Sequence, residues 1–153
     1  MGIVNSLQLL IHRCDFLVTQ LVRFWALPRQ TRVLLCLSVA FQIVARAALN
    51  VASVSRVVSA ASWLGATLRC RRIDTETLRW ALAAAAARTG GTCLTQAIAA
   101  RIFCGWAIPR SVLIIGVRRV PGAMDFHAWT EIDGLCVPRA ADAESFVPLM
   151  VWS

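Results

Sequence analysis

Residues 89–105 read TGGTCLTQAIAARIFCG, and this stretch decides the fold. The glycine pair Gly90-Gly91 ends the helix pattern that precedes it, and Thr92 is a favoured N-cap residue for a new helix. The apolar residues that follow recur at helical spacing. The pattern therefore predicts an apolar helix that begins at Cys93.

The chain before this stretch is predicted to be helical. Polar residues recur every three or four positions in the first part of the chain, which indicates an amphipathic helix, and Pro28 ends it. Asp74 is a good N-cap for the last helix before the glycine pair. These helices are expected at about 3–25, 31–49, 51–68 and 75–88.

The chain after this stretch changes from helical to strand character. Residues 112–117 form a β-branched apolar run, and Pro121-Gly122 supplies a turn after it. Residues 126–132 alternate, and Asp133-Gly134 predicts a hairpin turn into a further strand at 135–137. Helices followed by strands indicate an α+β fold in which the cysteine helix packs on a small antiparallel sheet.

A chain of 153 residues is long enough for one compact domain. We expect a single domain over residues 1–153, with a helical, arginine-rich part at 1–72 and a core at 73–153 that contains the cysteine helix and the sheet. The net charge of +8 comes entirely from arginine, and ten arginines face three acids in residues 1–80. Because no basic run is interleaved with aromatic residues, nucleic acid is not an expected partner. An anionic membrane surface or an acidic peptide is an expected partner.

The mean hydropathy of +0.66 raises the question of a membrane segment, and residues 33–54 are long enough to span a bilayer. Gln42, Arg46 and Asn50 interrupt that segment at a spacing of four, so they form one polar stripe on a helix. A spanning helix avoids a central arginine. The stripe favours an amphipathic helix that packs on a protein core or lies in a membrane interface.

The cysteines and tryptophans give weaker expectations. Six cysteines are scattered without any Cys-x-x-Cys pair, so neither a metal site nor a redox dithiol is expected. No basic, apolar and small-residue segments occur in the order of a secretory signal, so we expect a cytoplasmic protein. Four tryptophans are expected to pack between helices: Trp25, Trp63, Trp80 and Trp106.

A cysteine and a histidine are the strongest candidates for chemistry. A thiol becomes a strong nucleophile when an imidazole takes its proton and a helix N-terminus stabilises the thiolate. Cys93 has the predicted helix start, and His127, on a strand that follows, is better placed than His12 inside an amphipathic helix. From these residues alone, a buried structural thiol and an ordinary strand histidine remain the alternative.

Three motifs resemble a known family when they are taken as a set in this order. They are Gly91-x-Cys93-Leu94-x-Gln96-Ala97-x-Ala99, Ile115-Gly116-Val117-Arg118 and His127-Ala128-Trp129-x-Glu131-x-Asp133-Gly134. Over roughly residues 78–150 the chain resembles the leader peptidase of lasso-peptide biosynthesis, a transglutaminase-like cysteine protease. The resemblance implies a transglutaminase/papain-like core.

The resemblance also implies roles and partners. Cys93 would attack the peptide bond between leader and core, with His127 as its base, and no cofactor is implied. The implied partners are the precursor leader peptide, a small leader-binding delivery protein and the ATP-dependent lasso cyclase. A transglutaminase-like acyltransferase and a non-catalytic module that binds a membrane or a partner are the alternative functions.

Asp142 is the candidate for the carboxylate that orients His127. The family places an aspartate about twelve residues beyond the histidine, but Arg139 stands there in this chain. If Asp133-Gly134 is a two-residue turn, His127 faces Ala140 across the hairpin, and Asp142 is one diagonal step away. Glu144, or no acid at all, is the alternative.

The oxyanion that forms during acyl transfer needs donors aimed at it. The backbone N–H of Cys93 is the natural donor at a helix start. Gln96 is either a second, side-chain donor or a solvated helix residue, and Trp129 either walls the site or packs in the core.

Overall fold

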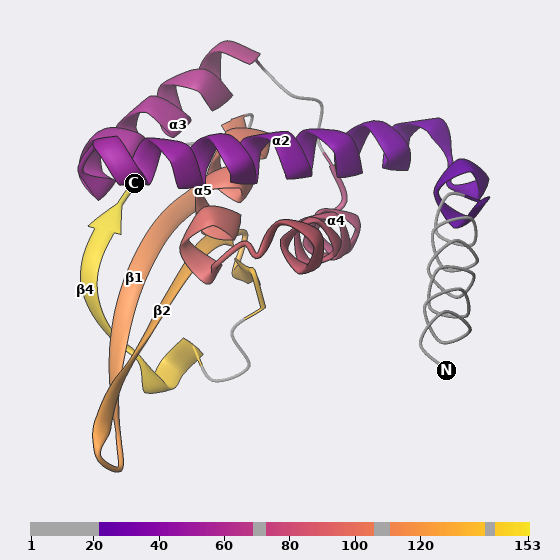
Figure 1. The fold of residues 1–153 in the computed structure, drawn as a ribbon. Coiled ribbons are helices and arrows are strands. Elements are labelled where there is room, and N and C mark those ends of the chain that lie inside the picture. The colour runs from indigo at the N-terminus through magenta and orange to yellow at the C-terminus, as the bar shows by residue number, and fades with distance from the viewer. Residues whose placement is uncertain (1–21, 69–72, 106–110, 140–142) are drawn as a thin grey trace, which may run out of the picture. The chain divides into compact units, whose positions relative to one another are not determined.

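The computed structural model describes residues 22–68, 73–105, 111–139 and 143–153 (Figure 1). The chain divides into two units between Val33 and Leu34. In the first unit, residues 22–26 are helical and the helix ends before Pro28, as predicted, whereas residues 1–21 lie outside the described ranges. Trp25 is 65% exposed there, and the Arg32 guanidinium lies 4.9 Å from the centre of its ring.

Two long helices follow, α2 (Arg29–Val51) and α3 (Val54–Leu68). They confirm the predicted helices at 31–49 and 51–68, with a break at residues 52–53. In the second unit, α2 has one buried face and one exposed apolar face. Its buried side chains recur at helical spacing: Leu34, Leu35, Ser38, Gln42 and Ala45. The helix packs on the protein core, as the polar stripe predicted, but Gln42 of the stripe is buried and the exposed face is apolar.

The helix α4 (Thr75–Thr89) has the ends that its sequence predicts. The carboxylate of Asp74 accepts a hydrogen bond from the backbone N–H of Thr77 at 2.9 Å, which caps the first turn. At the other end Gly90 has φ 64° and its N–H donates to the carbonyl of Ala86. A left-handed residue at this position ends helices, and glycine adopts it without steric cost.

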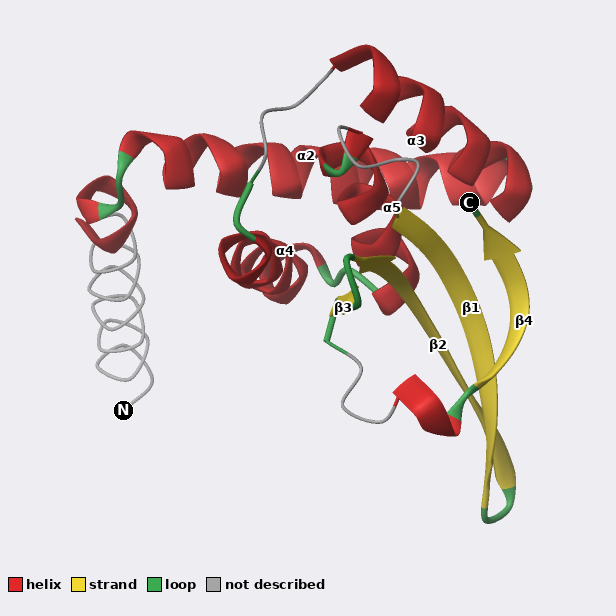
Figure 2. Ribbon diagram, turned by 180° about the vertical axis from the view of Figure 1, so that it is seen from behind, coloured by secondary structure: helices red, strands yellow, loops and turns green. Residues whose placement is uncertain are grey.

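After α5 (Cys93–Phe103) the chain forms one antiparallel sheet of the strands β1 (Ser111–Val120), β2 (Ala123–Ile132), β3 (Leu135–Val137) and β4 (Val147–Trp152). The strand order is β3-β2-β1-β4, so β1 and β2 are central (Figure 2). A short 3-10 helix, η2 (Ala143–Ser145), precedes β4. Within the described residues this is the helices-then-strands order of the predicted α+β class, which the structure confirms.

The turn between β2 and β3 is the predicted two-residue hairpin. Asp133 and Gly134 have φ values of 49° and 79°, as a primed turn requires, and Ile132 faces Leu135. The described part of this ladder ends at Val137, and Pro138, which has no N–H, follows. Ala140, the predicted partner of His127, lies outside the described residues. On the other side of β2, His127 pairs with Gly116 of β1.

The helix α5 packs against one face of the sheet. Ala97 and Ile98 belong to the same buried cluster as Leu113 of β1 and Ala128 of β2. The buried hydroxyl of Thr130 donates to the carbonyl of Ala97 at 2.8 Å. The cysteine helix therefore covers the two central strands, as the sequence predicted.

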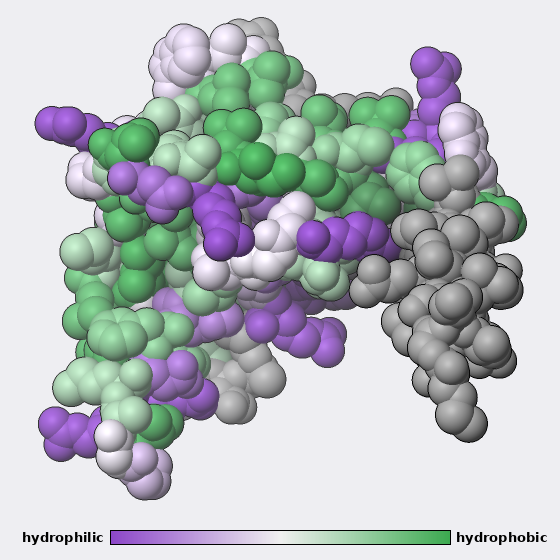
Figure 3. All heavy atoms as spheres, viewed as in Figure 1, coloured by the Kyte–Doolittle hydropathy of each residue, from purple (hydrophilic) through white to green (hydrophobic). Residues whose placement is uncertain are grey.

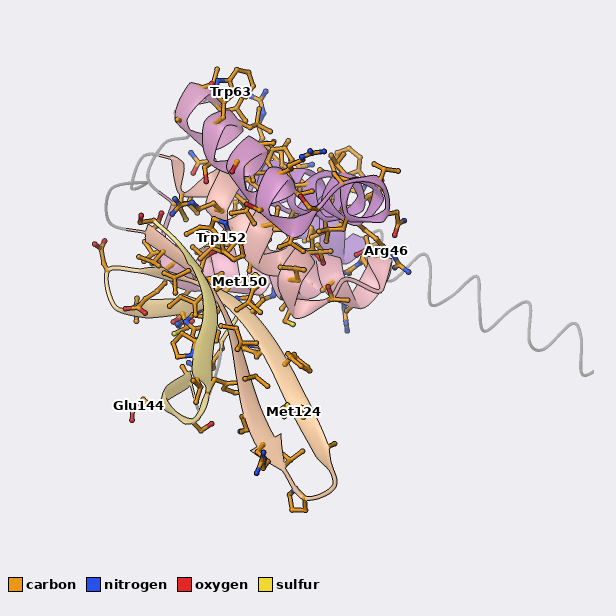
Figure 4. The ribbon with its side chains drawn as sticks, turned by 90° about the vertical axis from the view of Figure 1, so that its left-hand side faces the viewer. Arg46, Trp63, Met124, Glu144, Met150 and Trp152 are labelled. Carbon is orange, nitrogen blue, oxygen red and sulfur yellow. The ribbon has the colours of Figure 1, made fainter. Side chains whose placement is uncertain are left out.

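The expectation that the tryptophans pack between helices is wrong for those that the structure describes. Trp63 is 69% exposed and Trp80 is 45% exposed. Trp63 lies on the outer side of α3 (Figure 4), away from the face that buries Val58 and Ala61. Trp106 lies outside the described residues. The buried face of α3 is filled by Val57, Val58, Ala61 and Gly65, and that of α4 by alanines with Leu78 and Leu82.

By length and composition alone, α2 could cross a membrane. Its surface in the second unit is largely apolar, and Figure 3 shows hydrophobic residues along it. The exposed members include Leu37, Ile43, Val44 and Val51. Because the opposite face of α2 packs on the rest of the domain, these exposed residues can contact a membrane surface or a partner protein.

Candidate active site

Cys93 is the first residue of α5, and Thr92 caps the helix in front of it. The Thr92 hydroxyl oxygen accepts a hydrogen bond from the backbone N–H of Thr95 at 3.3 Å, and the Thr95 hydroxyl donates to the Thr92 carbonyl at 3.0 Å. The first N–H groups of a helix have no acceptor within the helix. The half-buried thiol of Cys93 therefore lies at the positive end of the helix dipole.

His127 lies in the middle of β2 and is held by aromatic rings. Its imidazole stacks on Trp129, with ring centres 6.0 Å apart and planes 21° apart, and lies 5.6 Å from the ring of Phe146. The Nε2 atom is buried and has no hydrogen-bond partner among the described residues. A buried polar atom of this kind requires a partner.

The surroundings of His127 lower its pKa below the ordinary value of 6.5. Burial is the main cause, since it disfavours the charged imidazolium. The carboxylate of Asp125 acts in the opposite direction, and the guanidinium of Arg118 lowers the pKa further. The neutral imidazole, which is the form a general base needs, is therefore favoured.

Arg118 and Asp125 form the ion pair beside this histidine. They face each other across β1 and β2, and two guanidinium nitrogens donate to Asp125 Oδ2 at 2.7 and 3.2 Å. The Arg118 guanidinium also lies 4.5 Å from the centre of the Phe146 ring. Arg118 thus contacts side chains of β2 and of the segment before β4.

Cys93 and His127 approach β2 from different faces. Cys93 packs against the cluster that contains Ala128, whereas His127 is one residue earlier on the strand. Because side chains alternate along a strand, Ala128 faces α5 and His127 faces the aromatic side. The two catalytic candidates make no hydrogen bond with each other in the described residues.

The edge of β2 is open at His127. The strand β3 pairs only with residues 130–132, so no described strand covers β2 beside the histidine. The imidazole and the thiol lie on opposite faces of β2 in this structure, and the histidine or its strand must move before the two side chains can meet.

The third member of the predicted site is not described. Asp142 lies outside the described residues, so its role stays a prediction. Glu144, its alternative, is exposed on η2 and projects outward in Figure 4. The unpartnered Nε2 of His127 is where an orienting carboxylate would bind.

Two residues of the site were not identified from the sequence as its parts. A Cβ at Gly116 would lie 2.9 Å from the Cβ of Phe146 and 3.1 Å from the Trp129 ring, so glycine makes room for the aromatic rings around His127. A glycine inside a β-branched run is a signal of such a close approach. Phe146 is far from the histidine in sequence and gave no signal.

The other titratable groups in the described part of the chain form no second centre. The described ranges contain no group of three or more His, Cys, Asp or Glu side chains that could hold a metal ion. Burial raises the pKa of the Cys136 thiol, and Glu131 raises it further. A thiol with a raised pKa is a poor nucleophile at neutral pH, so Cys136 is not a competitor of Cys93.

A family model described as the transglutaminase-like superfamily matches residues 33–151, well over half of the chain. The chain belongs to the transglutaminase-like superfamily. No curated protein and no solved structure matches it. The match begins in α2, upstream of residues 78–150, which carry the motif resemblance. Transglutaminase-like domains carry out cysteine-protease or acyltransferase chemistry.

In this transglutaminase-like domain, the start of α5 offers two of the parts that acyl transfer needs, and the base is not among them. The Cys93 thiol is the nucleophile candidate, and the adjacent backbone N–H groups can stabilise an oxyanion. Gln96 is half-buried one turn further on, with its backbone N–H bonded to Thr92. Trp129, only 4% exposed, is both a core residue and the neighbour of the His127 ring.

Proposed function

We propose that this protein is a cysteine peptidase that removes the leader from a ribosomally made lasso-precursor peptide. The observation that carries the proposal is Cys93 at the first position of a capped helix inside a transglutaminase-like domain. The motif set around Cys93 and His127 supports the narrower assignment to leader removal. The cytoplasm is the proposed compartment, because the precursor is made there.

The proposed reaction has two steps. The Cys93 thiol gives its proton to the His127 imidazole, and the thiolate sulfur attacks the carbonyl carbon at the end of the leader. The oxyanion accepts hydrogen bonds from the start of α5, including the N–H of Cys93. The C–N bond then breaks, and the imidazolium gives its proton to the amine of the departing core peptide.

The second step releases the leader. Its acyl group is bound to Cys93 as a thioester, and the imidazole takes a proton from a water molecule that attacks the thioester carbon. The thiolate leaves and is protonated again, and the leader departs with a free carboxylate. If an amine instead of water attacks, the same site is an acyltransferase.

The reacting pair must assemble before the first step. We propose that substrate binding rearranges β2 and draws the imidazole out of its stack with Trp129 and Phe146 toward the thiol. Asp142 is the proposed partner of Nε2 in the assembled site. One nitrogen of the imidazole would then face the thiol while the other is held by the carboxylate.

The proposed partners follow from the reaction. A delivery protein would bring the leader to Cys93, and the lasso cyclase would receive the core with its newly freed amine. ATP would belong to the cyclase. The exposed apolar residues of α2, with the arginine-rich charge of this part of the chain, also fit a peripheral membrane contact.

The test uses the purified chain, the delivery protein and the precursor peptide, with and without a primary amine at high concentration. Mass spectrometry of the products identifies the acceptor. We expect a free leader acid and a free core, even when the amine is present. An amine-linked leader as the main product would show the acyltransferase alternative, and an unchanged precursor would contradict the proposed substrate.

A further inference from the structure

The polar stripe of α2 contacts the loop that leads to Cys93. Arg46 Nη1 donates to the carbonyl of Thr89 at 3.2 Å and to the carbonyl of Gly90 at 3.3 Å. Both carbonyls belong to the end of α4, where helix carbonyls lack acceptors within the helix and favour a positive charge. Figure 4 labels the Arg46 side chain on α2.

Gln42, one helical turn earlier, contacts the same loop from inside the domain. It is 1% exposed, and its Nε2 donates to the carbonyl of Leu82 on α4 at 2.9 Å. Its Oε1 is buried, has no hydrogen-bond donor among the described residues, and lies against Gly91. A Cβ at Gly91 would lie 2.1 Å from that oxygen.

The close approach explains the second glycine of the pair. Gly90 has a positive φ, whereas Gly91 does not, so Gly91 is required for space and not for backbone conformation. The space is taken by the Gln42 side chain. A buried amide on α2 and a glycine two residues before Cys93 are therefore fitted to each other.

We propose that Gln42 and Arg46 are positioning residues for Cys93. Together they hold the 89–91 loop so that Thr92 caps α5 and the thiol stands at a fixed place. A pair of glycines has high conformational freedom, and these two side chains restrict it from outside the loop. The catalytic consequence of this inference rests on the proposed function. The restraint of the loop does not depend on that function.

The consequence for catalysis follows from geometry. A nucleophile that is misplaced by about 1 Å can lose roughly 100-fold in rate. Gln42 and Arg46 contact neither Cys93 nor His127 in any described hydrogen bond, so they act through the loop. Loss of either restraint should lower kcat and leave KM for the precursor nearly unchanged.

The experiment compares Arg46→Ala, Arg46→Lys and Gln42→Ala with Asn50→Ala as the matched control. Asn50 is the exposed third member of the same stripe. Two quantities are measured on the full chain: hydrogen exchange of the backbone amides of Gly90, Gly91, Thr95 and Gln96, which donate to Ala86 or Thr92, and kcat and KM for precursor cleavage. Melting temperature is recorded for each variant.

We expect Arg46→Ala to raise exchange of these four amides about 10-fold and to lower kcat about 10- to 100-fold. Arg46→Lys should keep part of the parental amide protection and part of the parental kcat, because an ammonium group can also donate to the carbonyls. Asn50→Ala should match the parent. If Gln42→Ala fails to fold, the exposed Arg46 still provides the test.

The inference is overturned if Arg46→Ala and Asn50→Ala show the same exchange and the same kcat. It is also overturned if exchange rises and kcat does not change while the parent cleaves the precursor. The exchange measurement needs no substrate, so it decides on the loop restraint even if the parent does not cleave. In that case only the proposed function fails.

Discussion

The aromatic surroundings of His127 set the pH range in which it can act as a base. Burial holds its pKa below 6.5, so the neutral form persists on the acid side of that value. Activity that needs the neutral imidazole should therefore fall only below pH 6.5. For the same reason, protonation of His127 favours the unfolded chain, and the stability that this group contributes is lost as the pH falls below 6.5.

Two substitutions should move the acid limb of the rate profile in opposite directions. Arg118→Ala removes a charge that lowers the pKa of His127 and leaves Asp125 unpaired, so the limb should shift to higher pH. Asp125→Asn removes the carboxylate that raises the pKa of His127, so the limb should shift to lower pH. The measurement is kcat/KM for precursor cleavage against pH.

Arg119→Ala is the control for this pair, because Arg119 is the exposed neighbour of Arg118 on β1. Its profile should coincide with that of the parent. Shifts in the same direction for Arg118→Ala and Asp125→Asn would contradict the electrostatic account of His127.

Single residues of the candidate site could be predicted from the sequence because their chemical type and spacing are local information. Cys93 follows a glycine pair and a capping threonine, and His127 heads a recognisable motif. The partner of the imidazole ring, Phe146, could not be predicted, because only the pairing of β4 with β1 brings it beside the histidine. The face on which His127 lies likewise depends on the packing of α5.

At the scale of elements, α3 and the end of α5 touch through their backbones. A Cβ at Gly65 would lie 2.8 Å from the carbonyl oxygen of Ile102, and a Cβ at Gly105 would lie 1.9 Å from the carbonyl oxygen of Gly65. Neither position has room for a larger residue. The two glycines therefore allow α3 to approach the nucleophile helix closely.

Gly65→Ala should lower the free energy of unfolding by about 1–3 kcal/mol, because the added methyl group forces the two helices apart. Urea denaturation followed by circular dichroism measures the change. Ser59→Ala, on the exposed side of α3, should change the free energy of unfolding by less than about 0.5 kcal/mol. Equal stabilities for the two variants would contradict a close backbone contact between α3 and α5 at Gly65.

Helix ends were predictable and strand lengths were not. Asp74, Gly90 and Thr92 act through neighbours a few residues away, so their sequence context suffices. The end of β3 at Val137 depends on Pro138 and on the path of the chain after it. The outward position of Trp63 depends on which face of α3 meets α5, and periodicity alone does not distinguish a small-residue face from a tryptophan face.

At the scale of the whole second unit, one buried arginine joins α3, α5 and β1. Arg101 is fully buried, its Nε donates to the Ser62 hydroxyl at 3.0 Å, and its Nη1 donates to both oxygens of Ser111. Burial lowers its pKa, and it still stays charged because guanidinium is a very strong base. The far end of the nucleophile helix is thus tied to the sheet.

Arg101→Met should lower the free energy of unfolding by about 3 kcal/mol, since it leaves buried serine and carbonyl oxygens without a donor. Thermal or urea unfolding measures the loss. Arg88→Met, on the exposed surface of α4, is the control and should cost less than about 1 kcal/mol. A loss for Arg101→Met no larger than that of the control would mean that these bonds contribute nothing to the fold.

The central claim is that Cys93 is the nucleophile of a leader peptidase. It is tested by the rate of precursor cleavage by the full chain, by Cys93→Ala and by Cys136→Ala, which removes the half-buried thiol of raised pKa. The account predicts that Cys136→Ala cleaves as the parent does and that Cys93→Ala is slower by about 1,000-fold or more. Cleavage by Cys93→Ala at the parental rate would contradict the account.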